Sequence, residues 1–262
     1  MFKFIFGVFL VVIFSFKQAH SEKIGIFEDH KIRSYSPVKV GVKDMLFDVR
    51  IKGIKDLIRG QTAITELDDV YFRVYWYFPD RYKVVVEGLP EGFKVLRNNL
   101  KVIVKPYIDL IFSEEVITQF SRYPYVADEK EKNSYLKKKT TTDLSEINVK
   151  FNKDGLLKVI NSKSPYSRIS TEFDYSKKSW SKGKFVTDRI MISEISQGIK
   201  SIKEMNITHG LISGTGLPES IVVTERFLRD DKEINNNSIN INFSNYVLNT
   251  GKARSILQGK KQ

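Results

Sequence analysis

The chain has 262 residues, a formal net charge of +12 and no cysteine. The lack of cysteine excludes disulfide bonds, thiolate catalysis, cysteine-type zinc sites and a lipid attached to an N-terminal cysteine. The positive charge favours anionic partners such as phospholipid head groups, lipopolysaccharide phosphates or nucleic acid, without choosing among them.

The first 21 residues have the pattern of a secretory signal peptide. Lys3 precedes an apolar run from Phe4 to Phe16, and Ala19 and Ser21 supply the small residues that a signal peptidase needs. As a helix the run is about 20 Å long, shorter than the ~30 Å core of a bilayer. We therefore expect cleavage before Glu22 and export to the periplasm; the competing interpretation is a retained membrane anchor.

The next part of the chain alternates apolar and polar residues with the period of two that predicts β-strands. Strands are expected from Lys43 to Gly53 and from Asp69 to Pro79, and a turn at Pro79 and Asp80 leads into a third strand. Their apolar faces hold Met45, Phe47, Val49 and Ile51, then Val70, Phe72, Val74, Trp76 and Phe78, then Tyr82, Val84 and Val86. Between Glu22 and Asp44, Pro37 and spaced valines favour extended chain.

Helical periodicity is scarce. The range 95–104 fits either a strand or a short helix, whereas 107–120 fits an amphipathic helix of about four turns. Residues 128–146 read DEKEKNSYLKKKTTTDLSE, which is polar and charged with no apolar face. This composition predicts a mobile surface loop.

Alternation resumes after this loop and predicts seven further strands. The expected ranges are 147–151, 156–160, 169–175, 185–195, 207–213, 221–227 and 239–243, with turns at 153–155, 164–165, 182–183 and 230–231. About ten strands joined by short turns favour a mainly β (α+β) fold, with one large curved antiparallel sheet or half-barrel and one or a few covering helices. We expect a single domain over residues 22–262.

No pattern in the chain predicts catalysis. The glycine-rich stretch from Ile212 to Gly216 lacks the lysine and helix of a phosphate loop, so a turn between strands explains it better. His30 and His209 have no carboxylate partners that the sequence singles out for a metal site or a triad. We therefore expect a protein that is not an enzyme, with no catalytic residue, no metal and no cofactor.

Three segments share a resemblance to a known family. Residues 71–90, YFRVYWYFPDRYKVVVEGLP, form a strand, a Trp-x-x-Pro-Asp turn and a second strand; residues 216–227, GLPESIVVTERF, enter a late strand; and residues 243–249, FSNYVLN, end the pattern. In this order they resemble the periplasmic lipoprotein-carrier (LolA-like) superfamily, of the outer-membrane lipoprotein-sorting type. The resemblance implies a half-barrel around an apolar cavity, lidded by helices, that shields the acyl chains of a lipid or lipoprotein in transit.

The leading hypothesis is therefore a periplasmic carrier or chaperone that binds acyl chains in an apolar cleft, with surface lysines attracting anionic head groups. The expected lipid-binding residues are Phe47, Val49, Ile51, Phe72, Val74, Trp76, Phe78 and Val84. A cleft wall and a core wall have the same sequence pattern, so ordinary packing against the expected helix at 107–120 is the competing interpretation.

Two further hypotheses are open. One is an envelope scaffold or sensor that holds a protein partner through the opposite face of the second strand, where Tyr71, Tyr75 and Tyr77 flank Arg73. The other is a polyanion binder, which rests on net charge alone. For the leading carrier hypothesis, the expected partners are lipid acyl chains or a lipoprotein and, in addition, an envelope protein and an anionic membrane surface. Nucleic acid is not an expected partner. An exported hydrolase with an unrecognised site ranks last.

Overall fold

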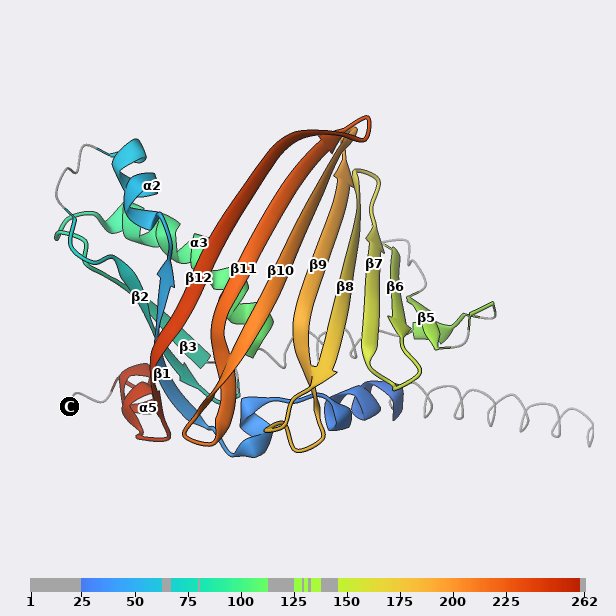
Figure 1. Cartoon of the computed structure of the whole chain (residues 1–262), viewed down its shortest axis with the longest axis horizontal. Coiled ribbons are helices and arrows are strands. Elements are labelled where there is room, and N and C mark those ends of the chain that lie inside the picture. The colour runs from blue at the N-terminus through green and yellow to red at the C-terminus, as the bar shows by residue number, and fades with distance from the viewer. Residues whose placement is uncertain are drawn as a thin grey trace, which may run out of the picture.

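The protein is built around one open antiparallel sheet of twelve strands (Figure 1). The structure is a computed structural model that describes residues 25–62, 67–79, 81–112, 125–128, 130–131, 133–137 and 146–259. The strand order is β3-β2-β1-β12-β11-β10-β9-β8-β7-β6-β5-β4, so β3 and β4 are the two edges. The expected fold class, a mainly β protein with one large curved sheet and few helices, is confirmed.

Twelve strands and five helical segments make up the described fold. The strands are β1 Asp44–Ile51, β2 Tyr71–Tyr77, β3 Arg81–Glu87, β4 Tyr125–Ala127, β5 Ser134–Lys137, β6 Glu146–Phe151, β7 Leu157–Lys163, β8 Ser167–Lys177, β9 Phe185–Ser196, β10 Ile199–Ile212, β11 Thr215–Arg229 and β12 Lys232–Leu248. The helical segments are an N-terminal helix over 25–33, η1 Pro37–Val40, α2 Ile54–Gln61, α3 Lys94–Phe112 and α5 Lys252–Leu257.

Two-residue turns connect the last four strands and explain their length. Both residues of each turn have positive φ, as a type I′ hairpin turn requires; the pairs are Gln197 and Gly198, Ser213 and Gly214, and Asp230 and Asp231. Such turns match the right-handed twist of the strands, so pairing continues up to the turn. Strands β10 to β12 consequently reach 14, 15 and 17 residues, longer than their apolar alternation predicts.

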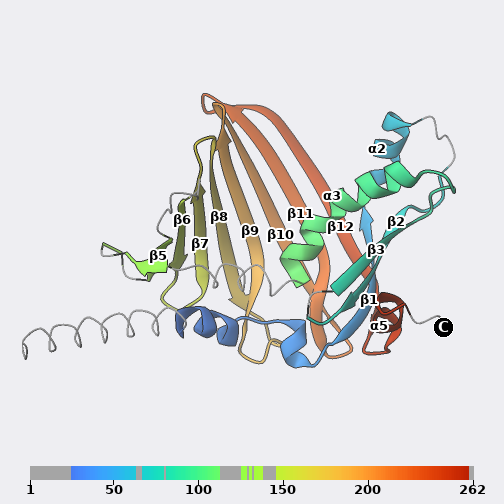
Figure 2. The ribbon, with the colours of Figure 1, turned by 180° about the vertical axis from the view of Figure 1, so that it is seen from behind.

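The helices lie on both faces and at one end of the sheet. Helix α3 crosses the concave face, as the view from behind shows (Figure 2). The N-terminal helix runs along the lower ends of β6 to β9, and α5 lies beside β1 and β2 (Figure 1). No helix of the described residues is long and apolar enough to cross a membrane. The signal-peptide range 1–21 lies outside the described residues.

The prediction of extended chain before β1 was wrong for residues 25–33, which are helical. Phe27 and His30 lie on one side of this helix and are buried. The Phe27 ring packs edge-on against Phe151, with ring centroids 5.2 Å apart. The helix carries few apolar residues, so contact with the sheet, rather than local periodicity, stabilises it.

Two other predictions need correction. The segments expected at 95–104 and 107–120 form one helix, α3, which continues through Pro106; residues 113–120 lie outside the described chain. The expected charged loop at 128–146 contains strand β5, because Ser134–Lys137 pairs with β4 on one side and β6 on the other. Four residues are too few for their alternation to be recognised in a polar context.

Trp76 provides a test of the sheet's packing against α3. Its side chain is 2% exposed and belongs to the main core, and Trp76 pairs with Met45 of β1 and Tyr82 of β3. We expect Trp76→Ala to lower the free energy of unfolding by about 3 to 5 kcal/mol, because it leaves a cavity in a packed interior. Urea denaturation measures this value. The matched variant Tyr75→Ala, at a half-buried position of the same strand, should lower the free energy of unfolding clearly less. Equal losses in the two variants would contradict the placement of Trp76 in the packed core.

Candidate functional site

The concave face of the sheet is apolar in its lower half. Two rows of directly paired residues cross it from strand to strand. The lower row is Ile207, Ile221, Ile241 and Ile51, and the next row is Phe173, Ile190, Met205, Val223 and Ile239. Directly paired residues on neighbouring strands point to the same side of a sheet, so these rows form a continuous apolar surface.

The apolar surface ends at a charged row. The row above holds Thr171, Ile192, Lys203, Glu225 and Asn237. Lys203 and Glu225 form an ion pair of 3.3 Å in the middle of this row. Tyr107 of α3 lies near the pair; burial raises the pKa of its phenol, an effect that Lys203 opposes and Glu225 reinforces. The helix therefore crosses the sheet at the boundary between the apolar and the polar part of the concave face.

Helix α3 is apolar on more than one side. Leu100, Val104 and Ile108 are buried in the core that α3 shares with the sheet. Val95 and Val102 are largely exposed, the latter at 69%. A helix that only covered a core would place polar residues on its outer side. Exposed valines on α3 instead extend the apolar surface beyond the packed interior.

Seven of the eight expected lipid-binding residues are packed together in the core. These are Phe47, Val49, Ile51, Phe72, Val74, Trp76 and Val84, each at most 9% exposed. Phe78 differs: it follows the end of β2 and is 39% exposed. The structure thus gives these strands the role of a core wall in this conformation, as the competing interpretation expected. Acyl binding by these residues stays a prediction.

The half-buried apolar residues of the concave face lie on other strands. Ile192 of β9, Ile207 of β10 and Ile239 of β12 pack against the core and stay partly exposed. The sequence analysis predicted strands over all three residues but did not single them out. Their alternation with polar neighbours was the available signal. Only the register, which aligns the three strands, shows that they share one face with α3.

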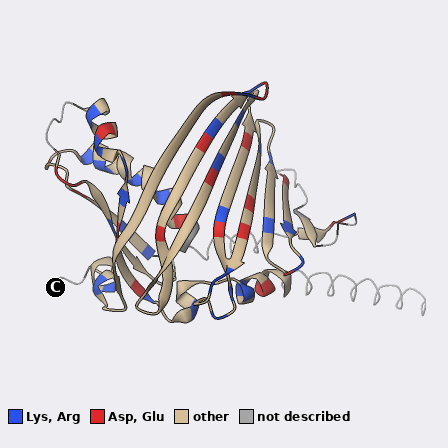
Figure 3. Cartoon of the chain, viewed as in Figure 1, with Lys and Arg blue, Asp and Glu red and all other residues tan. Residues whose placement is uncertain are grey.

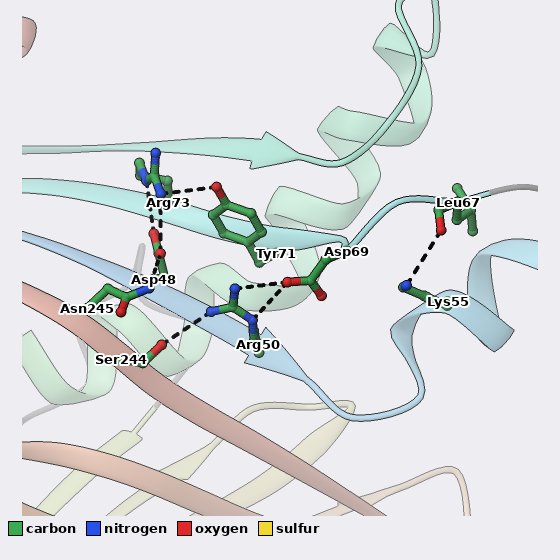
Figure 4. A network of polar contacts seen from close by, with 9 residues as sticks. All are labelled: Asp48, Arg50, Lys55, Leu67, Asp69, Tyr71, Arg73, Ser244 and Asn245. Atoms are coloured by element: carbon green, nitrogen blue, oxygen red, sulfur yellow. Dashed lines mark hydrogen bonds and ion pairs between the residues drawn. The ribbon is translucent and has the colours of Figure 1, made fainter.

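The convex face carries a polar network instead (Figure 4). Asp48 of β1 is 1% exposed, and its carboxylate accepts hydrogen bonds from Arg73 Nε at 2.9 Å and from Asn245 Nδ2 at 2.8 Å. The Asp48 carboxylate raises the pKa of the Arg73 guanidinium. Arg50 is held in turn by Asp69 at 2.9 Å and Ser244 at 3.3 Å. These contacts join β1, β2 and β12 across the convex face.

The tyrosine-rich face belongs to this network. The Tyr71 ring lies between two guanidinium groups, 4.8 Å from Arg50 and 5.2 Å from Arg73, and its hydroxyl accepts a hydrogen bond from Arg73 at 3.0 Å. Arg254 of α5 lies over the Tyr77 ring at 5.7 Å. Tyr71 and Tyr77 are therefore engaged within the chain, which weakens the prediction that this face binds a protein partner.

Further along the sheet, residues of both charges alternate on the long strands (Figure 3), and on the convex face they form ion pairs. Asp174 contacts Lys158 and Arg189, and Arg189 also contacts Glu204 at 3.3 Å. The lysine contact lowers the pKa of Asp174, burial opposes this effect, and Arg189 adds to it. Alternating charges do not form the single-sign surface that a polyanion requires.

Both histidines of the described chain have a lowered pKa. His30 is 1% exposed, and its Nδ1 accepts a hydrogen bond from the Leu157 backbone N–H at 3.1 Å. Burial, followed by the nearby charge of Lys39, lowers its pKa to about 4. His209 also has a pKa lowered to about 4, again mainly by burial. Among the residues described, no three or more acidic or histidine side chains are placed to hold a metal ion.

Comparisons with known proteins add no relative. The chain matches no protein-family model, no curated protein and no solved structure. The resemblance to lipoprotein carriers therefore stays a prediction from the three quoted segments, and the functional argument depends on the geometry of the sheet and its helices.

The buried His30 predicts a loss of stability in acid. The folded protein binds a proton at His30 only near pH 4, whereas an unperturbed histidine binds one near pH 6.5. The contribution of this group is complete above pH 6.5 and is lost as the pH falls towards 4, up to about 3 kcal/mol. Urea midpoints between pH 7 and 4 should therefore fall less steeply in His30→Asn, whose side-chain oxygen takes the place of Nδ1 as the acceptor for the Leu157 N–H and does not titrate. Parallel curves would contradict this assignment.

Proposed function

We propose that the protein is a non-enzymatic periplasmic carrier or chaperone that shelters the acyl chains of a lipid or lipoprotein against the concave face of its sheet. The observation that carries the proposal is the open, curved sheet with an apolar concave surface and an apolar helix laid across it (Figure 2). An open sheet can admit a ligand between α3 and the strands, where a closed and filled barrel cannot.

The acyl chain would lie where the apolar surface is only partly covered. Ile207 and Ile239 supply that surface, and Ile192, directly paired with Lys203, lies at its polar border beside the Lys203–Glu225 pair. Each methylene removed from water contributes about 0.8 kcal/mol, so a ten-carbon chain would gain roughly 8 kcal/mol before the costs of binding. That gain is enough for carriage without any covalent chemistry.

Three features of the sequence support the carrier proposal. The signal-peptide pattern of residues 1–21 directs the chain to the compartment where lipoproteins cross the envelope. The net charge of +12 attracts anionic head groups. The segments 71–90, 216–227 and 243–249 resemble the lipoprotein-carrier superfamily in order and in local pattern.

Substitutions on strand β9 test the proposal. Ile192 lies on the concave face, and Ile195, three residues on and 46% exposed, lies on the convex face. We expect Ile192→Asp to weaken binding of dansyl-undecanoic acid at least tenfold, because a carboxylate would enter the acyl site. Ile195→Asp should keep the Kd of the parent protein. Circular dichroism checks that both variants fold.

The natural cargo is tested on the exported protein itself. Its native mass spectrum, before and after organic extraction, should show extra mass that extracts as phospholipid or acylated material. A clean mass, together with no uptake of the dansyl fatty acid, would contradict the carrier proposal and favour the packed core as the whole role of these residues.

A further inference from the structure

Strand β3 is a free edge of the sheet. Its seven residues, Arg81–Glu87, pair with β2 on one side only. In the part of the chain that the structure describes, no strand and no backbone hydrogen bond is found on its other side. A strand of this length with unpaired N–H and C=O groups is a template for another strand.

A groove of about 640 Å³ runs along this free edge. Its residues come from three elements: Arg81, Tyr82 and Val84 from β3, Lys101, Val102 and Lys105 from α3, and Leu257 from α5. Tyr82 and Val84 are paired with the concave-face residues Trp76 and Val74, whereas α5 reaches the convex face through Arg254 and Tyr77. The groove therefore extends around the edge of the sheet, with a helix on either side.

Asp44 holds helix α5, which forms one side of the groove, in its position. One oxygen of this buried carboxylate accepts a hydrogen bond from the Gly251 N–H at 3.0 Å, and the other accepts one from the Arg254 N–H at 2.7 Å. A carboxylate from β1 thus satisfies backbone donors at the start of α5. The helix is held in place beside the edge strand, so the groove is part of the folded structure.

The charges of the groove are unbalanced. Lys105 binds Asp109 at 2.6 Å and lies over the Tyr82 ring at 5.5 Å. Arg81 and Lys101 have no ion pair among the described residues. Two cations without an acidic partner in the described part of the chain, beside an apolar floor, are complementary to a ligand that is both acidic and apolar.

We propose that this groove binds an extended acidic segment of a protein partner, which adds to the sheet as a strand beside β3. Side chains of an added strand alternate between the two faces, as those of β3 do. Apolar side chains would meet Val84 and Val102 on the α3 side, and acidic side chains would meet Arg81 and Lys83 on the other. The partner sequence should therefore alternate apolar and acidic residues over this length.

Two other occupants fit the groove less well. A second copy of this chain, paired edge to edge, would bring together two edges that each carry the cations Arg81, Lys83 and Lys101 against one carboxylate, Glu87, so positive charge would be in excess where the copies meet. An acyl chain would leave the edge N–H and C=O groups of β3 without partners. This inference is independent of the acyl site proposed on β9, β10 and β12, because Ile192, Ile207 and Ile239 do not line the groove.

The test measures binding of a fluorescein-labelled peptide of four Val-Glu repeats to the full exported chain by fluorescence anisotropy. We expect the double variant Arg81→Glu with Lys83→Glu to weaken binding about tenfold or more, because these are the cations that the acidic side chains would meet. The matched control is Lys153→Glu with Lys232→Glu, two exposed lysines outside the groove that give the same change of net charge. It should bind within about twofold of the parent.

Hydrogen exchange identifies the mode of binding. Added peptide should slow amide exchange within Arg81–Glu87, because edge N–H groups become bonded. The proposal is overturned if the peptide does not bind, if both double variants lose binding equally, or if β3 amides exchange unchanged. It is also overturned if dansyl-undecanoic acid displaces the peptide, which would make the groove an acyl site. Ile192→Asp should leave peptide binding intact, so failure of the carrier proposal is distinguishable.

Discussion

The pairing of β1 with β12 is the contact on which the architecture depends. It joins strands that are nearly two hundred residues apart in the chain, with Met45 opposite Leu248 and Ile51 opposite Ile241. All other strand pairs connect neighbours along the chain. Without this one non-local pair, the β1 to β3 unit and the long meander of β4 to β12 would be two separate sheets. The pairing therefore creates the continuous curved surface that α3 crosses.

The two faces of that surface have different chemistry, and this difference directs the functional argument. The concave face has apolar rows that end at the Lys203–Glu225 pair, whereas the convex face has the Asp48–Arg73 network and alternating ion pairs. Buried charge on the convex side is paired and hydrogen-bonded, as burial requires. On the concave side, apolar side chains such as Ile192, Ile207 and Ile239 pack against the core and stay partly exposed, which is the surface on which the carrier proposal depends.

The two edge strands of the sheet differ in length. Of the residues that the structure describes, three form the edge strand β4 and seven form the edge strand β3. Cationic side chains at a long edge discourage pairing between identical copies while leaving it open to an acidic chain. The proposed carrier would meet a donor and an acceptor of its cargo, and an edge strand near α3 would place such a contact beside the helix that covers the apolar surface.

The amino-acid sequence by itself determined ten of the twelve strands, at least in part, the inward faces of β1 and β2, and several of the turns. Alternation around Phe47 and Val74 identified the core side of β1 and β2 correctly, because one residue in two must be apolar when one face is buried. Tertiary structure decided the rest. The helix around His30 is stabilised by a hydrogen bond to Leu157, which is far away in the chain, and strand β5 is stabilised by pairing with β6. The polar ends of β10 to β12 are held by the register of their hairpins. No local sequence pattern contains these contacts. Whether Phe72 and Trp76 face a cleft or a packed interior was likewise decided by where α3 lies, since the same apolar residues suit both.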